Sequence, residues 1–303
     1  MTDDADELTE PTLTAEDLLV LDDPRFGPET ASIVTGGASG IGRATALALA
    51  ANGLTVVAAD VDEDGLAETV ARGDDLGLDG EVVPVTADLT DDVEVEAVVE
   101  TAVDHGNLRY VANVAGMQHI ASIPDFPMEA YDRLLDVMLR APFLLSKLAM
   151  PHIRETDDSE ASDDASGNRT QSGDGDGAIG NMCSVHGHYA TQDKAAYITA
   201  KHGLRGLTRS IAAEGEGTLR SFSVSVGYVL TPLMVNQIED TASERGISER
   251  AVIEDVMLGQ ARTKEMMTPA EVANLFVFGF SGHGKHLNGG DMLWDGGYKT
   301  TYE

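Results

Sequence analysis

The sequence has little that would suit an oxidising compartment, a membrane or a polyanionic partner. Cys183 is its only cysteine, so no disulfide can form within the chain, and a reducing, cytoplasmic location is expected. No run of about 18 apolar residues is present, so no membrane span is predicted. Residues 2–7 are acidic, the opposite of a basic and then apolar export signal.

Basic residues are also scarce. The 303 residues include 20 Lys and Arg against 52 Asp and Glu, which gives a net charge of −32. Such a surface repels nucleic acid and anionic lipid, so neither is an expected partner. It also repels itself at low ionic strength, where screening is weak. We interpret this acidic, lysine-poor composition as that of a halophilic protein in a salt-rich cytoplasm, and we predict no metal site.

Two stretches of the chain differ in composition from the rest. Residues 1–28 are acidic and interrupted by prolines, and we predict a tail whose apolar patch at 18–21 docks one helical turn on the body. Residues 155–177 are rich in Asp, Ser and Gly, which predicts a surface-loop insertion. Residues 29–303 are otherwise expected to form a single domain.

The remaining sequence alternates between strand and helix patterns. Strands are predicted at 32–35, 54–60, 81–87, 109–113, 178–183, 221–227 and 289–294, and helices at 41–51, 65–71, 92–105, 129–153, 194–214 and 269–281. Strands separated by helices of this length indicate a parallel sheet covered on both faces. The predicted fold is a doubly wound, Rossmann-like α/β domain of about seven strands.

A glycine-rich turn, TGGASGIG, lies between the first predicted strand and the first predicted helix. Its glycines allow backbone amides to approach a pyrophosphate at the helix N-terminus. Asp60 ends the second strand, where a carboxylate can bind the adenosine ribose hydroxyls and repel a 2′-phosphate, so NAD is favoured over NADP. A cap for the following helix is the alternative role for Asp60. The turn residues predicted to bind the cofactor are Thr35, Gly36, Ser39, Gly40, Ile41 and Gly42.

The glycine spacing TGxxxGxG resembles that of the short-chain dehydrogenase/reductase family, and the resemblance covers about residues 29–299. Asp88 resembles the adenine-contacting aspartate of the family, the stretch 113–116 its Asn-Asn-Ala-Gly element, and 295–297 its closing turn. The resemblance implies further cofactor-binding residues: Asp88, Leu89, Asn113, Ala115, Gly116, Tyr197, Lys201 and Thr231.

Tyr197, Lys201 and Ser184 are predicted to be catalytic. The tyrosine and lysine are four residues apart and share one face of a predicted helix, and the serine ends the fifth strand. An adjacent ammonium and an oxidised nicotinamide are expected to lower the pKa of the tyrosine, which is about 10 when unperturbed. The lysine can also hold the nicotinamide ribose, while the serine steadies the substrate oxygen. This set matches the active site of the family in spacing.

One position departs from the family pattern in a way that affects catalysis. Met138 stands where the family has an asparagine, and a thioether cannot hold the ordered water that passes protons from the lysine to solvent. Two further positions differ from the family. Val114 replaces the second asparagine of the Asn-Asn-Ala-Gly element, and the sequence Ser-Val-Gly at 225–227 stands where Pro-Gly is usual. We expect a slowed or rerouted proton relay, and a non-catalytic NAD(H)-binding protein is the alternative.

Local strings at 115–119, 183–187, 194–203 and 231–238 resemble the D-3-hydroxybutyrate dehydrogenase branch of the family. Two of only six lysines lie at 194–201, which gives this region a positive field suited to an anion. A solvated lysine and a hydrogen-bonded strand-end histidine are the alternatives for Lys194 and His186. The resemblance implies substrate-binding residues for a small anionic hydroxy or oxo acid: Gln118, Ser184, His186, Lys194 and Gln237, with Tyr228 and Tyr298 at its methyl end.

The expected reaction is the NAD-dependent interconversion of (R)-3-hydroxybutyrate and acetoacetate. The alternatives within the family are a 3-oxoacyl-thioester reductase and a sugar or polyol dehydrogenase. The resemblance further implies a lid at 231–268 and a homotetramer packed through the helices at 129–153 and 194–214.

Overall fold

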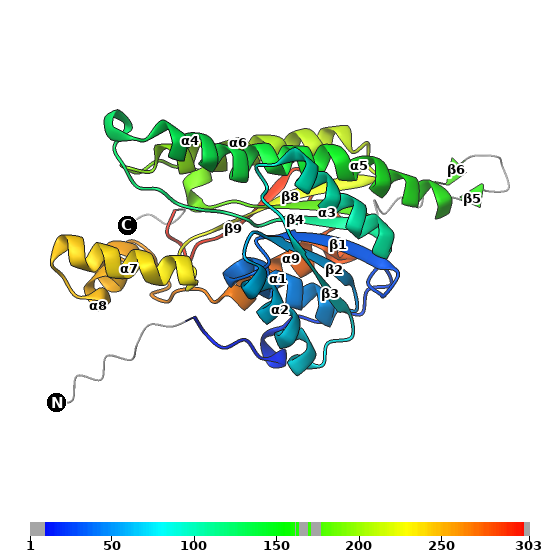
Figure 1. The fold of residues 1–303 in the computed structure, drawn as a ribbon, viewed down its shortest axis with the longest axis horizontal. Helices are drawn as coiled ribbons and strands as arrows, with labels where there is room; N and C mark the ends of the chain where they lie inside the picture. The colour runs from blue at the N-terminus through cyan, green and yellow to red at the C-terminus, as the bar shows by residue number, and fades with distance from the viewer. Residues whose placement is uncertain (1–9, 161, 164–168, 171–176, 300–303) are drawn as a thin grey trace.

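The computed structural model describes residues 10–160, 162–163, 169–170 and 177–299. At its centre is a parallel sheet with the strand order β3-β2-β1-β4-β7-β8-β9 (Figure 1). Its strands are β1 (Thr30–Thr35), β2 (Thr55–Asp60), β3 (Glu81–Thr86), β4 (Asn107–Asn113), β7 (Gly177–Met182), β8 (Leu219–Val226) and β9 (Gly290–Trp294). All seven predicted strands are present, and the predicted doubly wound fold is confirmed.

Helices cover both faces of the sheet (Figure 1). One face carries α1 (Gly40–Ala51), α2 (Glu63–Leu76) and α9 (Pro269–Phe280), and the other carries α3 (Asp92–His105), α5 (Ala141–Glu160) and α6 (Ala195–Glu214). Both faces of a parallel sheet must be buried in this way, because crossover helices connect its strands. Two hydrophobic cores result, one on each side of the sheet.

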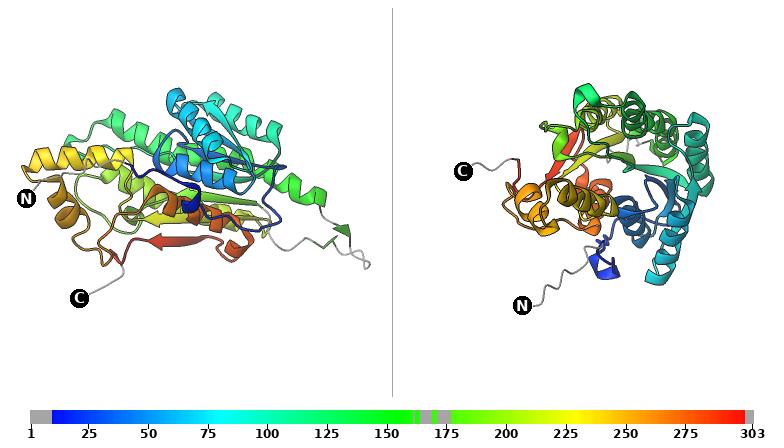
Figure 2. Two further views of the ribbon diagram at one scale, coloured as in Figure 1. Left: turned by 90° about the horizontal axis from the view of Figure 1, so that it is seen from below. Right: turned by 60° about the vertical axis from the view of Figure 1, so that its left-hand side comes forward.

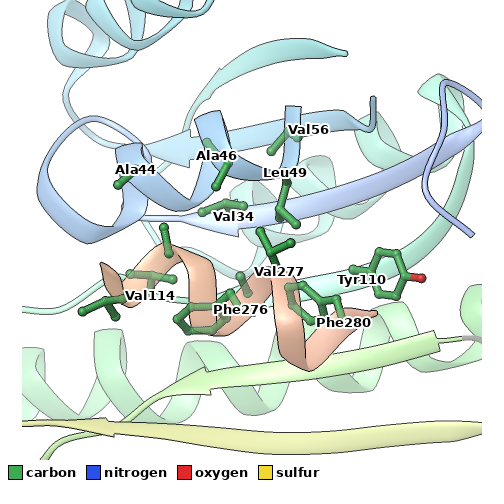
Figure 3. Packing of buried hydrophobic residues seen from close by; sticks show 14 of the residues in the cluster. Val34, Ala44, Ala46, Leu49, Val56, Tyr110, Val114, Phe276, Val277 and Phe280 are labelled. Carbon is green, nitrogen blue, oxygen red and sulfur yellow. The ribbon is translucent and has the colours of Figure 1, made fainter. Parts of the chain in front are cut away.

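The first core fixes the position of α1. Leu49 of α1 and Val34 of β1 pack against Phe276, Val277 and Phe280 of α9 (Figure 3). Nearly all of α1 is buried, and seven of its twelve residues are buried alanines or glycines, whose small size allows this close approach. The N-terminus of α1 is therefore held rigidly at the carboxyl end of β1.

The second half of the N-terminal segment lies along this same face. A single 3₁₀ turn, Ala15–Asp17, is followed by the buried Leu18. The side-chain amide of Asn52, the residue that caps the C-terminus of α1, donates to the Leu19 carbonyl at 2.8 Å. The side-chain oxygen of Asn274 in α9 accepts from the Leu19 amide, also at 2.8 Å. The segment therefore bridges the first and last helices of the sheet, in addition to covering apolar surface.

The structure differs from the predicted elements in two regions. The predicted helix at 129–153 consists of α4 (Met128–Leu135), a π-helical segment (Asp136–Arg140) and α5, and α5 continues to Glu160. The predicted loop at 155–177 therefore begins as helix. Two short strands, β5 (Ser162–Asp163) and β6 (Arg169–Thr170), follow, and its other residues lie outside those described.

The predicted lid region contains helices that the sequence analysis did not identify. Residues 231–268 form α7 (Pro232–Arg245), the short α8 (Glu249–Ala251) and a π-helical segment (Val252–Met257). Figures 1 and 2 show α7 and α8 projecting beyond one end of the sheet. Ile238 of α7 packs on Val252 and Met257 of the π-helical segment, in a cluster separate from the two main cores.

Candidate active site

A cleft lies at the carboxyl ends of the central strands, where chain connections leave β1 in one direction and β4 in the other. Such a reversal point is where doubly wound sheets bind ligands. The cleft is lined by the glycine turn, Asp60, residues 114–117, residues 182–184, Tyr197, Lys201 and residues 226–234 with the exception of 228 and 230. The structure thus brings the predicted turn and the predicted catalytic residues into one site.

The glycine turn has the geometry of a dinucleotide cradle. Gly36 and Gly40 have φ values of +74° and +52°, which favour glycine. A Cβ on Gly36 would lie 2.9 Å from the Cα of Ala115, and one on Gly42 would clash with the Gly36 carbonyl. Backbone amides at the start of α1 thus remain accessible to a pyrophosphate, as a nicotinamide dinucleotide requires.

Asp60 lies at the cleft beside this turn. Its Oδ2 accepts a hydrogen bond from the amide of Ala38 at 3.1 Å, and its Oδ1 accepts one from the amide of Asp62 at 3.2 Å. The cap of α2 is Asp62, whose side chain accepts from the amide of Gly65, so the alternative role of Asp60 as helix cap is not needed. Each carboxylate oxygen of Asp60 can accept a further hydrogen bond from a ribose hydroxyl.

Four residues that were predicted to bind the cofactor do not line the cleft themselves. Thr35 Oγ1 accepts from the amides of Val114 and Ala115, and Asn113 donates to Asn181, so both fasten the end of β4. Asp88 accepts from Thr90, and this hydrogen bond lowers the pKa of its carboxyl. Leu89 is buried in the second core. None of the four belongs to the cleft lining among the described residues.

The three catalytic candidates converge at the inner end of the cleft. Ser184 follows β7 and caps a short 3₁₀ helix, Val185–Gly187, by accepting from the amide of His186. Tyr197 and Lys201 project from α6, with Lys201 Nζ 5.4 Å from the centroid of the Tyr197 ring. The ammonium also donates to the carbonyl of Met182 at 2.8 Å, which fixes its position.

Burial controls the protonation of this pair. It lowers the pKa of Lys201 to about 8 and raises the pKa of Tyr197 to about 12, against a Ser184 hydrogen bond that acts in the opposite direction. In the chain's own groups, desolvation of the phenolate is the dominant influence on this pKa. The predicted lowering of the tyrosine pKa also involves an oxidised nicotinamide, and it stays a prediction. The chain by itself keeps Tyr197 protonated, and hence able to act as an acid.

His186 and Lys194 lie next to the catalytic residues. His186 is buried, with Nδ1 3.4 Å from Ser184 Oγ and Nε2 3.2 Å from Thr191 Oγ1. Burial, together with the nearby Lys194 charge, lowers the pKa of this histidine to about 4. Lys194 occupies the N-cap position of α6 and is half-buried, and this burial lowers its pKa. The pair gives the site a partly buried positive charge and a neutral imidazole.

The other predicted substrate residues are placed less centrally. Tyr228 and Tyr298 contact each other with ring centroids 6.2 Å apart, and burial raises the pKa of Tyr228 to about 12. Gln118 and Gln237 are half-buried, on the loop after β4 and on α7. Among the described residues, neither glutamine side chain is hydrogen-bonded to the catalytic group. Tyr189 was not predicted as a site residue, because no motif marks it. Its ring stacks on that of Tyr298, with centroids 5.9 Å apart.

Apolar cleft residues were also missed: Met117, Met182, Cys183, Val226, Val229, Pro232, Leu233 and Met234. Their only signal is adjacency to a predicted site residue, since apolar side chains of this kind are equally typical of a core.

Met138 lies in the π-helical segment and is fully buried against Leu134, Ala196 and Ala200. Its sulfur faces Gly116, at 3.6 Å from the position of a Cβ there. Residue 142 is a proline, which has no N–H, so the Met138 carbonyl lacks the donor that an α-helix would provide. The polar group that this position can offer to a water molecule is therefore its backbone oxygen rather than its side chain.

Among the residues that the structure describes, no helix is both long and apolar enough to cross a membrane. In the same part of the chain, no group of three or more His, Cys, Asp or Glu side chains is arranged to hold a metal ion.

Comparison with known proteins agrees with this site. A family model described as short chain dehydrogenase matches residues 30–242. The chain is 34% identical to a D-beta-hydroxybutyrate dehydrogenase of Rhizobium meliloti over 88% of this chain and 97% of that protein. It is 31% identical to the protein of the same name from Cupriavidus necator, over 88% and 96%. The crystal structure of levodione reductase superimposes with a TM-score of 0.80 at 28% identity, covering 91% of this chain and 100% of that one. The chain therefore belongs to the short-chain dehydrogenase family, whose oxidoreductases bind nicotinamide cofactors.

Proposed function

We propose that the protein is an NAD-dependent dehydrogenase that interconverts (R)-3-hydroxybutyrate and acetoacetate. The observation that carries this proposal is the buried His186 in contact with Ser184 and Tyr197, with the half-buried Lys194 charge nearby. An otherwise strongly acidic protein needs a local positive group to attract a small carboxylate. The similarity to two D-beta-hydroxybutyrate dehydrogenases supports the same substrate class.

In this proposal each side chain has a defined task at the substrate. Lys194 and His186 bind the carboxylate, and the Ser184 hydroxyl donates to the reacting oxygen. Tyr197 gives its proton to that oxygen during reduction and takes it back during oxidation. When bound, the nicotinamide supplies or accepts the hydride. Lys201, held by the Met182 carbonyl, keeps a positive charge near the phenol and stabilises the phenolate that forms.

NAD is the proposed cofactor because of Asp60. A 2′-phosphate on the adenosine ribose would approach a carboxylate whose oxygens are already oriented by the amides of Ala38 and Asp62. Repulsion between two such anions disfavours NADP. Gly36, Gly40 and Gly42 would hold the pyrophosphate against α1.

We also propose that the protein works as a homotetramer in a salt-rich cytoplasm. An apolar depression formed by Leu135, Leu139, Arg140, Phe143 and Leu207 lies on α4, α5 and α6, and the Phe143 side chain is 58% exposed. Such a surface favours association with another copy. We expect the protein to bind neither membranes nor nucleic acid, because its net charge of −32 repels both.

The test is NADH oxidation by the purified protein in concentrated KCl, with acetoacetate, with longer 3-oxo acids, and with NADPH as the cofactor control. Turnover of acetoacetate with NADH, lost in Tyr197→Phe, is the expected result. Preference for a 3-oxoacyl thioester or a sugar would contradict the substrate. Tight NADH binding without any turnover would favour the non-catalytic alternative, for which Met138 is the motivating observation, and Met138→Asn would then be expected to restore activity.

A further inference from the structure

A second polar network lies behind residues 183–189, which carry Ser184 and His186 and which we name the catalytic loop. This network does not take part in the mechanism above. His188 follows the 3₁₀ helix that Ser184 caps. Its Nε2 lies 2.8 Å from Asp291 Oδ2 in β9, and its Nδ1 lies 2.9 Å from Lys299 Nζ. Asp291 also accepts from the hydroxyls of Ser223 and Ser225 in β8. The network connects the catalytic loop, the edge of the sheet and the chain just after β9.

The contacts define the protonation state of His188. An ammonium has only donors, so Nδ1 must accept from Lys299, and Nε2–H must donate to Asp291. This neutral tautomer agrees with the burial of the ring, which lowers the pKa of His188. The charged groups facing the ring are Asp291 from β9, Arg205 from α6 and Lys299 from the C-terminal turn.

The same two segments also meet at the residue that adjoins each member of this pair in the sequence. Tyr189 stacks on Tyr298 with ring centroids 5.9 Å apart and an interplanar angle of 20°. His188 with Lys299 and Tyr189 with Tyr298 thus form two adjacent pairs, which we name the C-terminal clasp. The loop side of the clasp is further anchored by Arg205, which donates to the carbonyl of Gly187 at 2.8 Å.

The clasp reaches the substrate side of the active site through one ring. The ring centroids of Tyr189 and His186 are 5.2 Å apart, and those of His186 and Tyr197 are 5.9 Å apart. Tyr298 contacts Tyr228 on the opposite side. A shift of the C-terminal turn would therefore move the ring that packs on His186, whereas the glycine turn and Asp60 belong to other strands.

We propose that His188 and Lys299 are positioning residues, which hold the C-terminal turn against the catalytic loop. They thereby fix the positions of His186 and of the three tyrosines at 189, 228 and 298 for substrate binding. This inference rests on the proposed function for its substrate. Loss of the clasp should weaken binding of the oxo acid while the cofactor site and the proton-transfer residues remain in place. KM should therefore respond more than kcat.

The first experiment uses steady-state kinetics with acetoacetate and NADH in the full-length protein. Lys299→Met and His188→Phe should each raise the KM for acetoacetate about tenfold, as loss of a charge-assisted hydrogen bond implies, with kcat changed less than about twofold and NADH affinity unchanged. His188→Asn, which keeps an acceptor near the Nδ1 position, should recover most of the KM. Lys285→Met removes the same charge from an exposed site and serves as the matched control.

A second experiment needs no substrate. Trp294 is the single tryptophan of the chain and ends β9, four residues before Tyr298. Acrylamide quenching of its fluorescence should increase in Lys299→Met and His188→Phe, and remain as in the wild type in Lys285→Met and His188→Asn. If acetoacetate is not turned over by the wild type, the proposed function fails, and this measurement still decides whether the clasp exists.

Two results would overturn the inference. The first is an unchanged KM together with unchanged quenching in Lys299→Met. The second is a joint loss of kcat, NADH affinity and melting temperature in both variants, which would indicate a general structural role. Increased quenching with a selective rise in KM supports it.

Discussion

Acid is expected to destabilise the folded protein through His186, whose imidazole is buried beside Ser184 and near Lys194. Burial lowers the pKa of this histidine from 6.5 to about 4, so between these values the unfolded chain binds a proton that the folded chain does not. At 1.36 kcal/mol per pKa unit, the difference corresponds to about 3 kcal/mol. The stability is fully present above pH 6.5 and is lost as the pH falls towards about 4.

Urea unfolding at a series of pH values in concentrated KCl can isolate this contribution. The many carboxylates of the chain also titrate in this range, so the quantity to measure is the difference between the wild type and His186→Gln. Glutamine has no proton to gain at these pH values. The unfolding free energy of the variant should therefore fall less steeply, and the difference should change by about 3 kcal/mol between pH 7 and pH 4.

His202→Gln is the matched control, because it removes an exposed histidine from the surface of α6. Its stability should follow the wild-type profile. Parallel profiles for the wild type and His186→Gln would refute the reasoning, since they would mean that His186 gains its proton equally in the folded and unfolded chains.

Three further outcomes follow from the site and the surface. Gly42→Ala should weaken NADH binding at least tenfold in a fluorescence titration, because its Cβ would clash with the Gly36 carbonyl; unchanged affinity would contradict the cradle. Tyr197→Phe should lower kcat by about 10² to 10⁴ with NADH affinity retained, and full activity would remove this residue from catalysis. The melting temperature should rise as KCl is added, because salt screens a net charge of −32; a flat profile in scanning calorimetry would argue against a halophilic surface.

Local patterns were sufficient to predict the sheet and the cofactor turn. Alternating apolar runs and helices predicted all seven strands of the sheet, and the glycines at 36, 40 and 42 predicted a turn that tolerates no Cβ at positions 36 and 42. Tyr197, Lys201 and Ser184 were found because their spacing on a helix and a strand end is itself a local signal. These features depend on residues close together in the sequence.

What the sequence did not predict depends on contacts between distant residues or on burial. Docking of the N-terminal segment through residues 18–21 was predicted, but its anchor Asn274, which is 255 residues from Leu19 along the chain, was not. Lys299 and His188 are separated by 111 residues and match no motif. The direction of the Tyr197 pKa shift depends on how deeply the ring is buried, which spacing alone does not give.

The packing of α1 against α9 has a consequence for how the chain folds during synthesis. Helix α1, near the start of the chain, buries its apolar side on α9, which is formed by residues 269–280 (Figure 3). A nascent chain that has already exposed β1, α1 and β2 outside the ribosome therefore cannot complete this core until more than 200 further residues have been made. Contacts of such long sequence separation fold slowly, and apolar surface stays exposed meanwhile. The cofactor-binding turn at the start of α1 consequently becomes rigid only after residues 269–280 have been made.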